Sequence, residues 1–252
     1  TGDRVGEADA RAWLGAAMGL LADVVAAQDQ YAGALRLYRS LHNRQGEAAV
    51  TLNAAMLRHA IGDNTSALDD IDRAENLFSQ VGDLRGQTIS VLNRARVLGE
   101  LGRFDAGVAC AEHGLQLAIR LGSAGYEAHA MGTLAYMERK CGRLERSLEL
   151  RLASVDAHRA LEHGAGLLDG LCELAFSYLE QGALDAARAV LQELDTCNHE
   201  AVGDLLAQSI PWALAQLHRA IGEPDRSVAY LATAHRLYRE RLEAIGDAAS
   251  CE

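Results

Sequence analysis

The chain has 252 residues, of which 49% are hydrophobic and 5% aromatic, and its net charge is −11. This length and apolar content can bury a sizeable core and exclude an intrinsically disordered chain. The acidic balance argues against direct nucleic-acid binding, because Lys140 is the only lysine, the arginines are scattered among acids, and phosphate contacts need clustered cations. Abundant Ala and Leu, with only two prolines, favour long helices.

No apolar run is long enough to span a membrane, and no signal peptide opens the chain, so we expect no membrane association. The five cysteines are odd in number and widely spaced, which favours reduced thiols and a cytoplasmic protein over a disulfide framework. The first residue is Thr1 and not Met, which is compatible with a piece excised from a longer protein.

A helix corner recurs every 40 residues, and we call a set of positions 40 residues apart a column. The corner glycines are Gly62, Gly102, Gly142, Gly182 and Gly222. Seven residues before them stand Ala55, Ala95, Ala135, Ala175 and Ala215. Five residues after them stand the small residues Ala67, Gly107, Ser147, Ala187 and Ser227. A fixed period of this size indicates a stacked-repeat architecture.

In chain order, the pattern predicts six antiparallel helix pairs, at 8–43, 46–82, 85–122, 126–163, 166–200 and 203–245, within a single domain that covers 1–252. The first pair, which contains "DQYAGALRLY", diverges from the others. Our interpretation places Ala22 in its alanine column, Ala34 in its small-residue column and Asp29 at its corner. In the last pair Pro211 lies inside the first helix, so we expect that helix to begin late or to kink.

Each column has a physical reason. The corner glycine ends the first helix of a pair, where a left-handed conformation costs glycine little. The alanine on the first helix and the small residue on the second let the two helices approach closely, since a larger side chain would force their axes apart. The chain is therefore expected to be all-α.

Helix pairs with this small–Gly–small spacing resemble tetratricopeptide repeats. The clearest stretches are "LNAAMLRHAIGDNTSALDDIDRAENLFSQVGD" and "LNRARVLGELGRFDAGVACAEHGLQLAIRLGS". Their length is similar to the 40-residue variety found in kinesin light chains, LGN-type adaptors and MalT-like bacterial regulators. The resemblance implies a right-handed superhelical solenoid of about six helix pairs, with HEAT-like repeats as the alternative fold. It also implies a concave groove, lined by first helices, that holds a peptide or a partner protein.

Groove positions are expected between the buried positions of the first helices. The candidates are Asn53, Met56, Asn93, Arg96, His129, Thr133, Tyr136, Arg139, Glu173, Phe176, Trp212 and Arg219. By the same register Leu52, Leu92 and Cys172 also face the groove. Asn53 and Asn93 lie one period apart, and the "LN" before each resembles an element whose Asn meets a ligand's main chain. An Asn amide both donates and accepts, which suits an extended peptide.

Each candidate also has a structural interpretation. The Asn residues could be solvated, the arginines Arg96, Arg139 and Arg219 could form exposed ion pairs rather than bind a carboxylate, and the aromatic residues could pack in the core. Cys197 and His199 in "CNHE" indicate a polar turn rather than a zinc site.

No catalytic motif is present in the sequence, so we expect neither an enzyme nor a cofactor or metal. Three function classes remain: a peptide- or protein-binding scaffold, a ligand-sensing module of a larger signalling or transcription regulator, and an enzyme, which the lack of a convergent polar cluster argues against. The long last helix leaves room for homo-oligomers formed through terminal helices.

Overall fold

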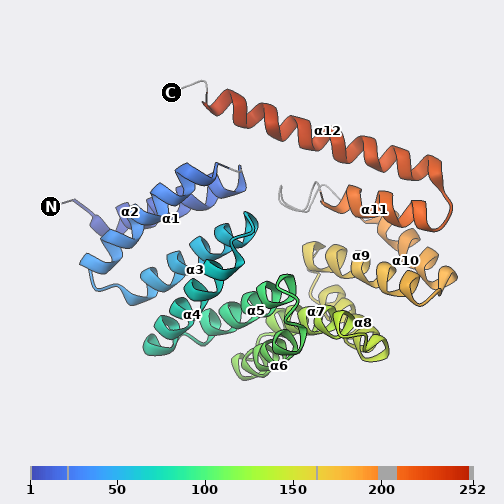
Figure 1. Ribbon diagram of the computed structural model, residues 1–252, viewed down its shortest axis with the longest axis horizontal. Coiled ribbons are helices and arrows are strands. Elements are labelled where there is room, and N and C mark those ends of the chain that lie inside the picture. The colour runs from blue at the N-terminus through green and yellow to red at the C-terminus, as the bar shows by residue number, and fades with distance from the viewer. Residues whose placement is uncertain (1, 22, 163, 198–208, 250–252) are drawn as a thin grey trace. The chain divides into compact units, whose positions relative to one another are not determined.

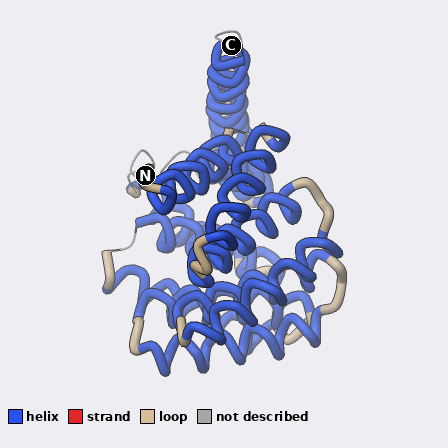
Figure 2. Tube along the Cα trace, turned by 90° about the vertical axis from the view of Figure 1, so that its left-hand side faces the viewer, coloured by secondary structure: helices blue, strands red, loops and turns tan. Residues whose placement is uncertain are grey.

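The chain is all-helical wherever the structure describes it. A computed structural model describes residues 2–21, 23–162, 164–197 and 209–249. Within these ranges the only regular elements are α-helices, and no residue belongs to a strand (Figure 2). The prediction of an all-α fold is therefore confirmed.

The helices alternate between first and second members of pairs (Figure 1). The first helices are α1 (Arg4–Leu20), α3 (Arg44–Ala60), α5 (Leu84–Glu100), α7 (Ala124–Lys140), α9 (Gly164–Glu180) and α11 (Ser209–Ala220). The second helices are α2 (Val24–Ser40), α4 (Asn64–Val81), α6 (Phe104–Leu121), α8 (Leu144–Ala160), α10 (Leu184–Thr196) and α12 (Pro224–Ala249).

The chain divides into two compact units, Thr1–Tyr126 and Glu127–Glu252, and the division falls within α7. In the first unit α1 packs on α2, α3 on α4 and α5 on α6, while α2 contacts α3 and α4 contacts α5. In the second unit α9 contacts α8, α10 and α11, and α11 packs on α12. Within each unit, the helices of a pair pack on each other and on a neighbouring pair, which is the contact pattern of stacked repeats.

The predicted corner glycines lie at the turns between paired helices, all with positive φ: 85° at Gly62, 70° at Gly102, 78° at Gly142, 71° at Gly182 and 84° at Gly222. A left-handed residue at this place lets the next amides return to the last turn of the helix. At the Gly62 corner the N–H of Asp63 donates to the Arg58 carbonyl, with an N–O distance of 3.0 Å. The Asp63 side chain then caps α4 by accepting from the N–H of Ser66.

In the second to sixth pairs, both predicted small-residue columns are buried. Ala55, Ala95, Ala135 and Ala175 are completely buried, and so are Ala67 and Ala187 on the second helices. Where the second helix carries serine, its hydroxyl donates to the backbone of the alanine column: Ser227 reaches the Ala215 carbonyl at 2.8 Å. Such contact requires close helix axes, so bulk is excluded there.

The first pair follows the same period as the others, and our placement of its corner at Asp29 was wrong. Asp29 lies inside α2, which begins at Val24 with Asp23 as its N-cap. In the true register Gly15 and Ala27 occupy the two small-residue columns, and both are buried. Ala34 is also buried, but it lies in a different column, while Ala22 lies outside the described residues.

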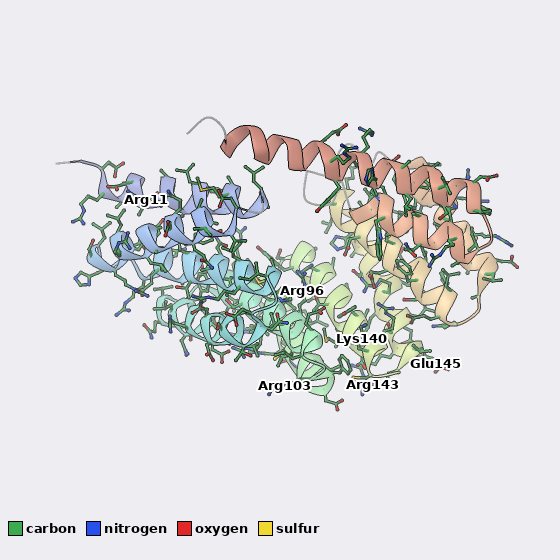
Figure 3. The ribbon with its side chains drawn as sticks, turned by 45° about the horizontal axis from the view of Figure 1, so that its top comes forward. Arg11, Arg96, Arg103, Lys140, Arg143 and Glu145 are labelled. Carbon is green, nitrogen blue, oxygen red and sulfur yellow. The ribbon has the colours of Figure 1, made fainter. Side chains whose placement is uncertain are left out.

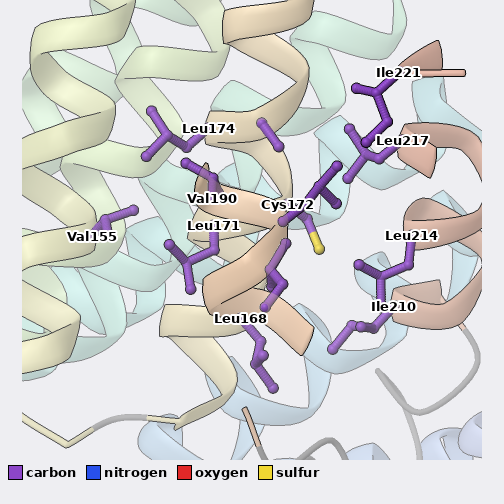
Figure 4. Packing of buried hydrophobic residues seen from close by; sticks show 13 residues of the cluster. Val155, Leu168, Leu171, Cys172, Leu174, Val190, Ile210, Leu214, Leu217 and Ile221 are labelled. Atoms are coloured by element: carbon purple, nitrogen blue, oxygen red, sulfur yellow. The ribbon is translucent and has the colours of Figure 1, made fainter. Parts of the chain in front are cut away.

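The core is made of apolar layers between helices. In the second unit one continuous cluster joins α8, α9, α10 and α11, with Leu171, Leu191 and Leu214 among its most buried side chains (Figure 4). In α11, which begins at Ser209, Pro211 is the third residue, where the absence of a backbone N–H is tolerated in a helix.

Candidate binding face

Asn53 on α3 and Asn93 on α5 are the clearest unsatisfied polar groups among the predicted positions. Asn53 is exposed and Asn93 is half-buried, and neither side chain hydrogen-bonds to any residue that the structure describes. Their helices contact each other, so the two amides, one period apart, belong to adjacent first helices. A pair of free amides can donate to and accept from a peptide main chain.

Met56 and Arg96 flank these amides, each one helical turn along from an asparagine. Met56 on α3 is half-buried, and Arg96 on α5 is exposed (Figure 3). The guanidinium of Arg96 pairs with no acid in the described part of the chain. Its neighbour Arg94 instead lies against Asp72 and Glu75 of α4. Arg96 is therefore free to meet an external anion.

Trp13 was missed by the sequence analysis. It lies on α1 in the column of Asn53 and Asn93, and the residue is 77% exposed. The sequence could have indicated this position, since Trp13 stands 40 residues before Asn53. It was overlooked because the corner of the first pair had been placed at Asp29. Together Trp13, Asn53, Met56, Asn93 and Arg96 form what we call the first-helix face of the first unit.

In the second unit Arg139 is already engaged. Its guanidinium lies 2.6 Å from the Glu180 carboxylate and 3.1 Å from that of Glu173, both on α9. It also lies 5.6 Å from the centroid of the Tyr136 ring. Since the charge of Arg139 is largely neutralised within the protein, a ligand carboxylate would have to compete with Glu173 and Glu180 for it.

The remaining predicted positions differ in accessibility. Thr133 is buried, and its hydroxyl donates to the His129 carbonyl of its own helix, so its side chain does not lie on an accessible surface. Phe176 packs against the apolar cluster of the second unit. His129, Trp212 and Arg219 are exposed, Trp212 by 55%.

The expectation that Leu52, Leu92 and Cys172 face a groove was wrong, because all three are buried. Each lies one residue from an accessible position, and one residue on a helix turns the side chain by about 100°. The burial of Cys172 also raises the pKa of its thiol to about 12, with Asp169 and Glu173 adding to the effect. The thiol stays protonated at neutral pH and is a poor nucleophile.

Among the described residues, no group of three or more His, Cys, Asp or Glu side chains is arranged to hold a metal ion. Cys197 belongs to this part of the chain, whereas His199 lies outside the described residues. No helix in the described ranges combines the length and the apolar character that a membrane crossing needs.

Comparison with solved structures identifies the architecture. The apo form of RapI superposes with a TM-score of 0.73 at 11% sequence identity, over 97% of this chain and 87% of that one. The chain has a tetratricopeptide-like repeat fold. No protein-family model matches the sequence, and no curated protein matches it either.

Two further neighbours share this tetratricopeptide-like fold. One is the Rap conjugation gene regulator of a plasmid in complex with a Phr peptide, with a TM-score of 0.61 and 14% identity, over 93% of this chain and 74% of that one. The other is a signal transduction ATPase with numerous domains and a tetratricopeptide repeat sensor, from Pyrococcus horikoshii. It has a TM-score of 0.66 and 16% identity. The match spans 98% of this chain and 38% of the Pyrococcus protein.

Proposed function

We propose that this chain is a binding scaffold that holds an extended segment of a partner protein on the first-helix face of the first unit. The observation that carries the proposal is the pair of unsatisfied amides, Asn53 and Asn93, on adjacent first helices. Each amide would donate to one main-chain carbonyl of the segment and accept from one N–H. Main-chain contacts of this kind hold a peptide in register, and side-chain pockets then select its sequence.

The neighbours of the two amides suggest what the segment carries. Trp13 offers a large exposed ring and Met56 an adaptable thioether, so both suit apolar side chains. Arg96 would pair with an acidic side chain or a terminal carboxylate. The partner is therefore a peptide with apolar and acidic residues, and not a nucleic acid, which the net charge of −11 would repel.

The second unit contributes further candidate contacts. We propose that Trp212 and Arg219 on α11 meet the partner directly, because both side chains are exposed. His129, Tyr136 and Phe176 would add contacts along α7 and α9. Arg139 and Glu173 act through their ion pair, which fixes α7 against α9.

A neighbour supports peptide binding. The plasmid Rap regulator, which has the same fold, was solved in complex with a Phr peptide. We infer from the fold and from the free amides that this chain uses its repeats in a comparable way, in the cytoplasm and without catalysis of its own.

The test is selection from a library of random peptides of about 12 residues against the immobilised chain, followed by titration calorimetry of the enriched peptides. Asn53→Ala combined with Asn93→Ala should weaken binding at least tenfold, since two hydrogen-bonding sites are lost. The melting temperature should stay nearly unchanged, because neither amide bonds within the described protein.

Asn76→Ala is the matched control, because Asn76 is an exposed residue of the second helix α4. It should leave both peptide affinity and melting temperature unaltered. Peptides that bind the doubly substituted chain as tightly as the original would show that the segment lies elsewhere.

A second candidate function is a sensor within a larger signalling or transcription regulator. It is favoured by the Pyrococcus protein, whose tetratricopeptide repeats are described as a sensor and of which this chain matches 38%. Reading the complete gene would decide: an ATPase or DNA-binding domain encoded in the same frame supports the sensor, and its absence leaves the free-standing scaffold.

A further inference from the structure

The last helix exposes side chains in columns that are buried in the preceding pairs. Tyr238 on α12 is 54% exposed, although Tyr38 and Phe78, in the same column on α2 and α4, are each only 4% exposed. Leu231 is 48% exposed, whereas Tyr31 and the other described members of its column are buried. In the part of α12 whose side chains the structure describes, the positions that face a following first helix in earlier pairs are therefore exposed.

The contact that buries this column elsewhere is an aromatic ring on a glycine. The ring of Tyr38 lies against Gly46 at the start of α3 so closely that a methyl group on Gly46 would overlap it. Phe78 lies against Gly86 at the start of α5 in the same way. A glycine in the first turn of one helix thus seats an aromatic ring from the helix before it.

The junction between α2 and α3 also contains an ion pair. Nε of Arg39 lies 2.8 Å from a carboxylate oxygen of Glu47. Beside it, the Asn43 side chain caps α3 by accepting from the N–H of Gly46 at 2.9 Å. The junction is thus made of Tyr38 and Arg39 on one side and of a capped Gly46–Glu47 turn on the other.

Both halves of this junction occur again at the two ends of the chain. The tetrapeptide "RLYR" stands at 36–39 and, five periods later, at 236–239 on α12. The turn that receives it, "NRQGEA" at 43–48, has its counterpart one period earlier in "DRVGEA" at 3–8. There the Asp3 side chain caps α1 by accepting from the N–H of Gly6 at 2.9 Å, as Asn43 does for Gly46.

At the start of α1, no aromatic ring of the described residues is seated on the glycine that corresponds to Gly46. The three atoms nearest to a methyl group on Gly6 all belong to the Asp3 side chain, whereas at Gly46 and Gly86 all three belong to an aromatic ring. Farther along α1, Ala10 and Ala17 are exposed and Leu14 is 48% exposed. The columns of Ala10 and Ala17 are buried in every later first helix, for example at Val50 and Leu57. In this chain the positions of α1 that face a preceding second helix in later pairs are thus exposed as well.

We propose that the chain associates head to tail, with α12 of one copy packing on α1 of the next as α2 packs on α3. Tyr238 of one copy would lie on Gly6 of the next, and Arg239 would pair with Glu7, as Arg39 pairs with Glu47. A second copy is the occupant because this chain itself carries both halves of the junction, including the complementary charges. In the isolated chain Glu7 pairs with Arg11 of its own helix and can exchange partners.

This association differs from a two-fold dimer in its consequences. The two surfaces are unlike, so each copy keeps one free surface, and association continues into open chains or closes into a ring. A contact between two helices is smaller than a standard stable interface, so we expect it to be weak and to depend on concentration.

Sedimentation velocity over about 1 to 500 µM protein tests the proposal, since interfaces of this size associate weakly. The unaltered chain should show a rising sedimentation coefficient. Tyr238→Glu removes one surface and Gly6→Leu the other, and each should raise the concentration needed for association at least tenfold. An equimolar mixture of the two variants should form a one-to-one complex and stop there, because each supplies the surface that the other lacks.

Two further variants separate this contact from general effects. Ala232→Glu adds the same charge to α12 in a column that is also exposed on α2 and α4, and it should not change association. Glu7→Arg and Arg239→Glu should each weaken association, and the chain that carries both should recover it.

A chain that stays monomeric throughout the concentration range overturns the proposal. So does a mixture of Tyr238→Glu and Gly6→Leu that remains monomeric, or an Ala232→Glu variant that dissociates as readily as Tyr238→Glu. None of these results bears on peptide binding by Asn53 and Asn93, so the two proposals can fail separately.

Discussion

The hydroxyl of Ser147 donates a hydrogen bond to the backbone carbonyl of Ala135, with an oxygen–oxygen distance of 2.7 Å. Ser147 lies on α8 and Ala135 on α7, and both are buried. Two periods later Ser227 makes the same bond to Ala215. A short side chain can reach the opposite helix backbone only where two axes run close together, so this contact explains why the columns exclude large residues.

Replacing Ala135 with leucine should therefore destabilise the protein. Overpacking at such a site costs about 1–3 kcal/mol, because the helices must separate or the side chain must adopt a strained rotamer. Urea unfolding followed by circular dichroism measures the change. Ala153→Leu on the exposed side of α8 is the control and should have little effect. Equal losses for the two variants would contradict the packing assigned to this column.

The corner glycines make a second prediction. Gly62 has a φ of 85°, so Gly62→Ala should lower the free energy of unfolding by about 1 kcal/mol through backbone strain alone. No atom lies within 4 Å of an added methyl group, so steric overlap does not contribute. Gly125→Ala, in the first turn of α7, meets open space without positive φ and should be neutral or slightly stabilising. The two variants are compared by thermal unfolding.

The fold could be predicted because the same structural requirements return in each helix pair. A left-handed corner needs glycine and a close helix contact needs a small residue, so the same residue types return at Gly62, Gly102 and their counterparts. The first pair was misplaced for the same reason. Forty residues before Gly62 the sequence has Ala22 and no glycine, so the interpretation followed Asp29 instead.

The candidate site could be predicted only in part. Asn53 and Asn93 were recognised because they share a column, whereas Trp13 was lost with the first corner. Thr133 occupies the same column but is buried, which depends on packing that one sequence does not reveal. The engagement of Arg139 depends on Glu173 and Glu180, which lie 34 and 41 residues away.

Alkaline titration should reveal two phenols with raised pKa values, on the buried Tyr38 and the half-buried Tyr230. Burial and a hydrogen bond to Asp9 raise the pKa of Tyr38 to about 12, and burial with a hydrogen bond to Asp195 raises that of Tyr230 to about 12. An unfolded tyrosine loses its proton near pH 10, so between pH 10 and 12 the unfolded chain binds fewer protons than the folded one. The contribution of these two phenols to the free energy of unfolding should be constant below pH 10. It should decrease as the pH rises toward 12.

Tyr38→Phe measures how much the Tyr38 phenol contributes to the loss of stability between pH 10 and 12. The variant loses the hydrogen bond to Asp9, so it should be less stable than the original chain at pH 8. Its stability should then fall less steeply between pH 10 and 12, because one titrating group has been removed. Urea unfolding at several pH values gives both quantities. An unchanged slope would mean that the Tyr38 hydroxyl has an ordinary pKa in the folded protein.

Trp13 separates recognition from stability. Because its ring is mostly exposed, Trp13→Ala should change the free energy of unfolding by no more than about 0.5 kcal/mol. If the ring anchors the peptide beside Asn53, the same substitution should weaken binding of the selected peptides by about tenfold, or about 1.4 kcal/mol. Trp13→Phe should recover part of that affinity, since a smaller ring keeps some of the contact. Full affinity in Trp13→Ala would restrict the binding face to α3 and α5 and would leave the exposed tryptophan without a part in it.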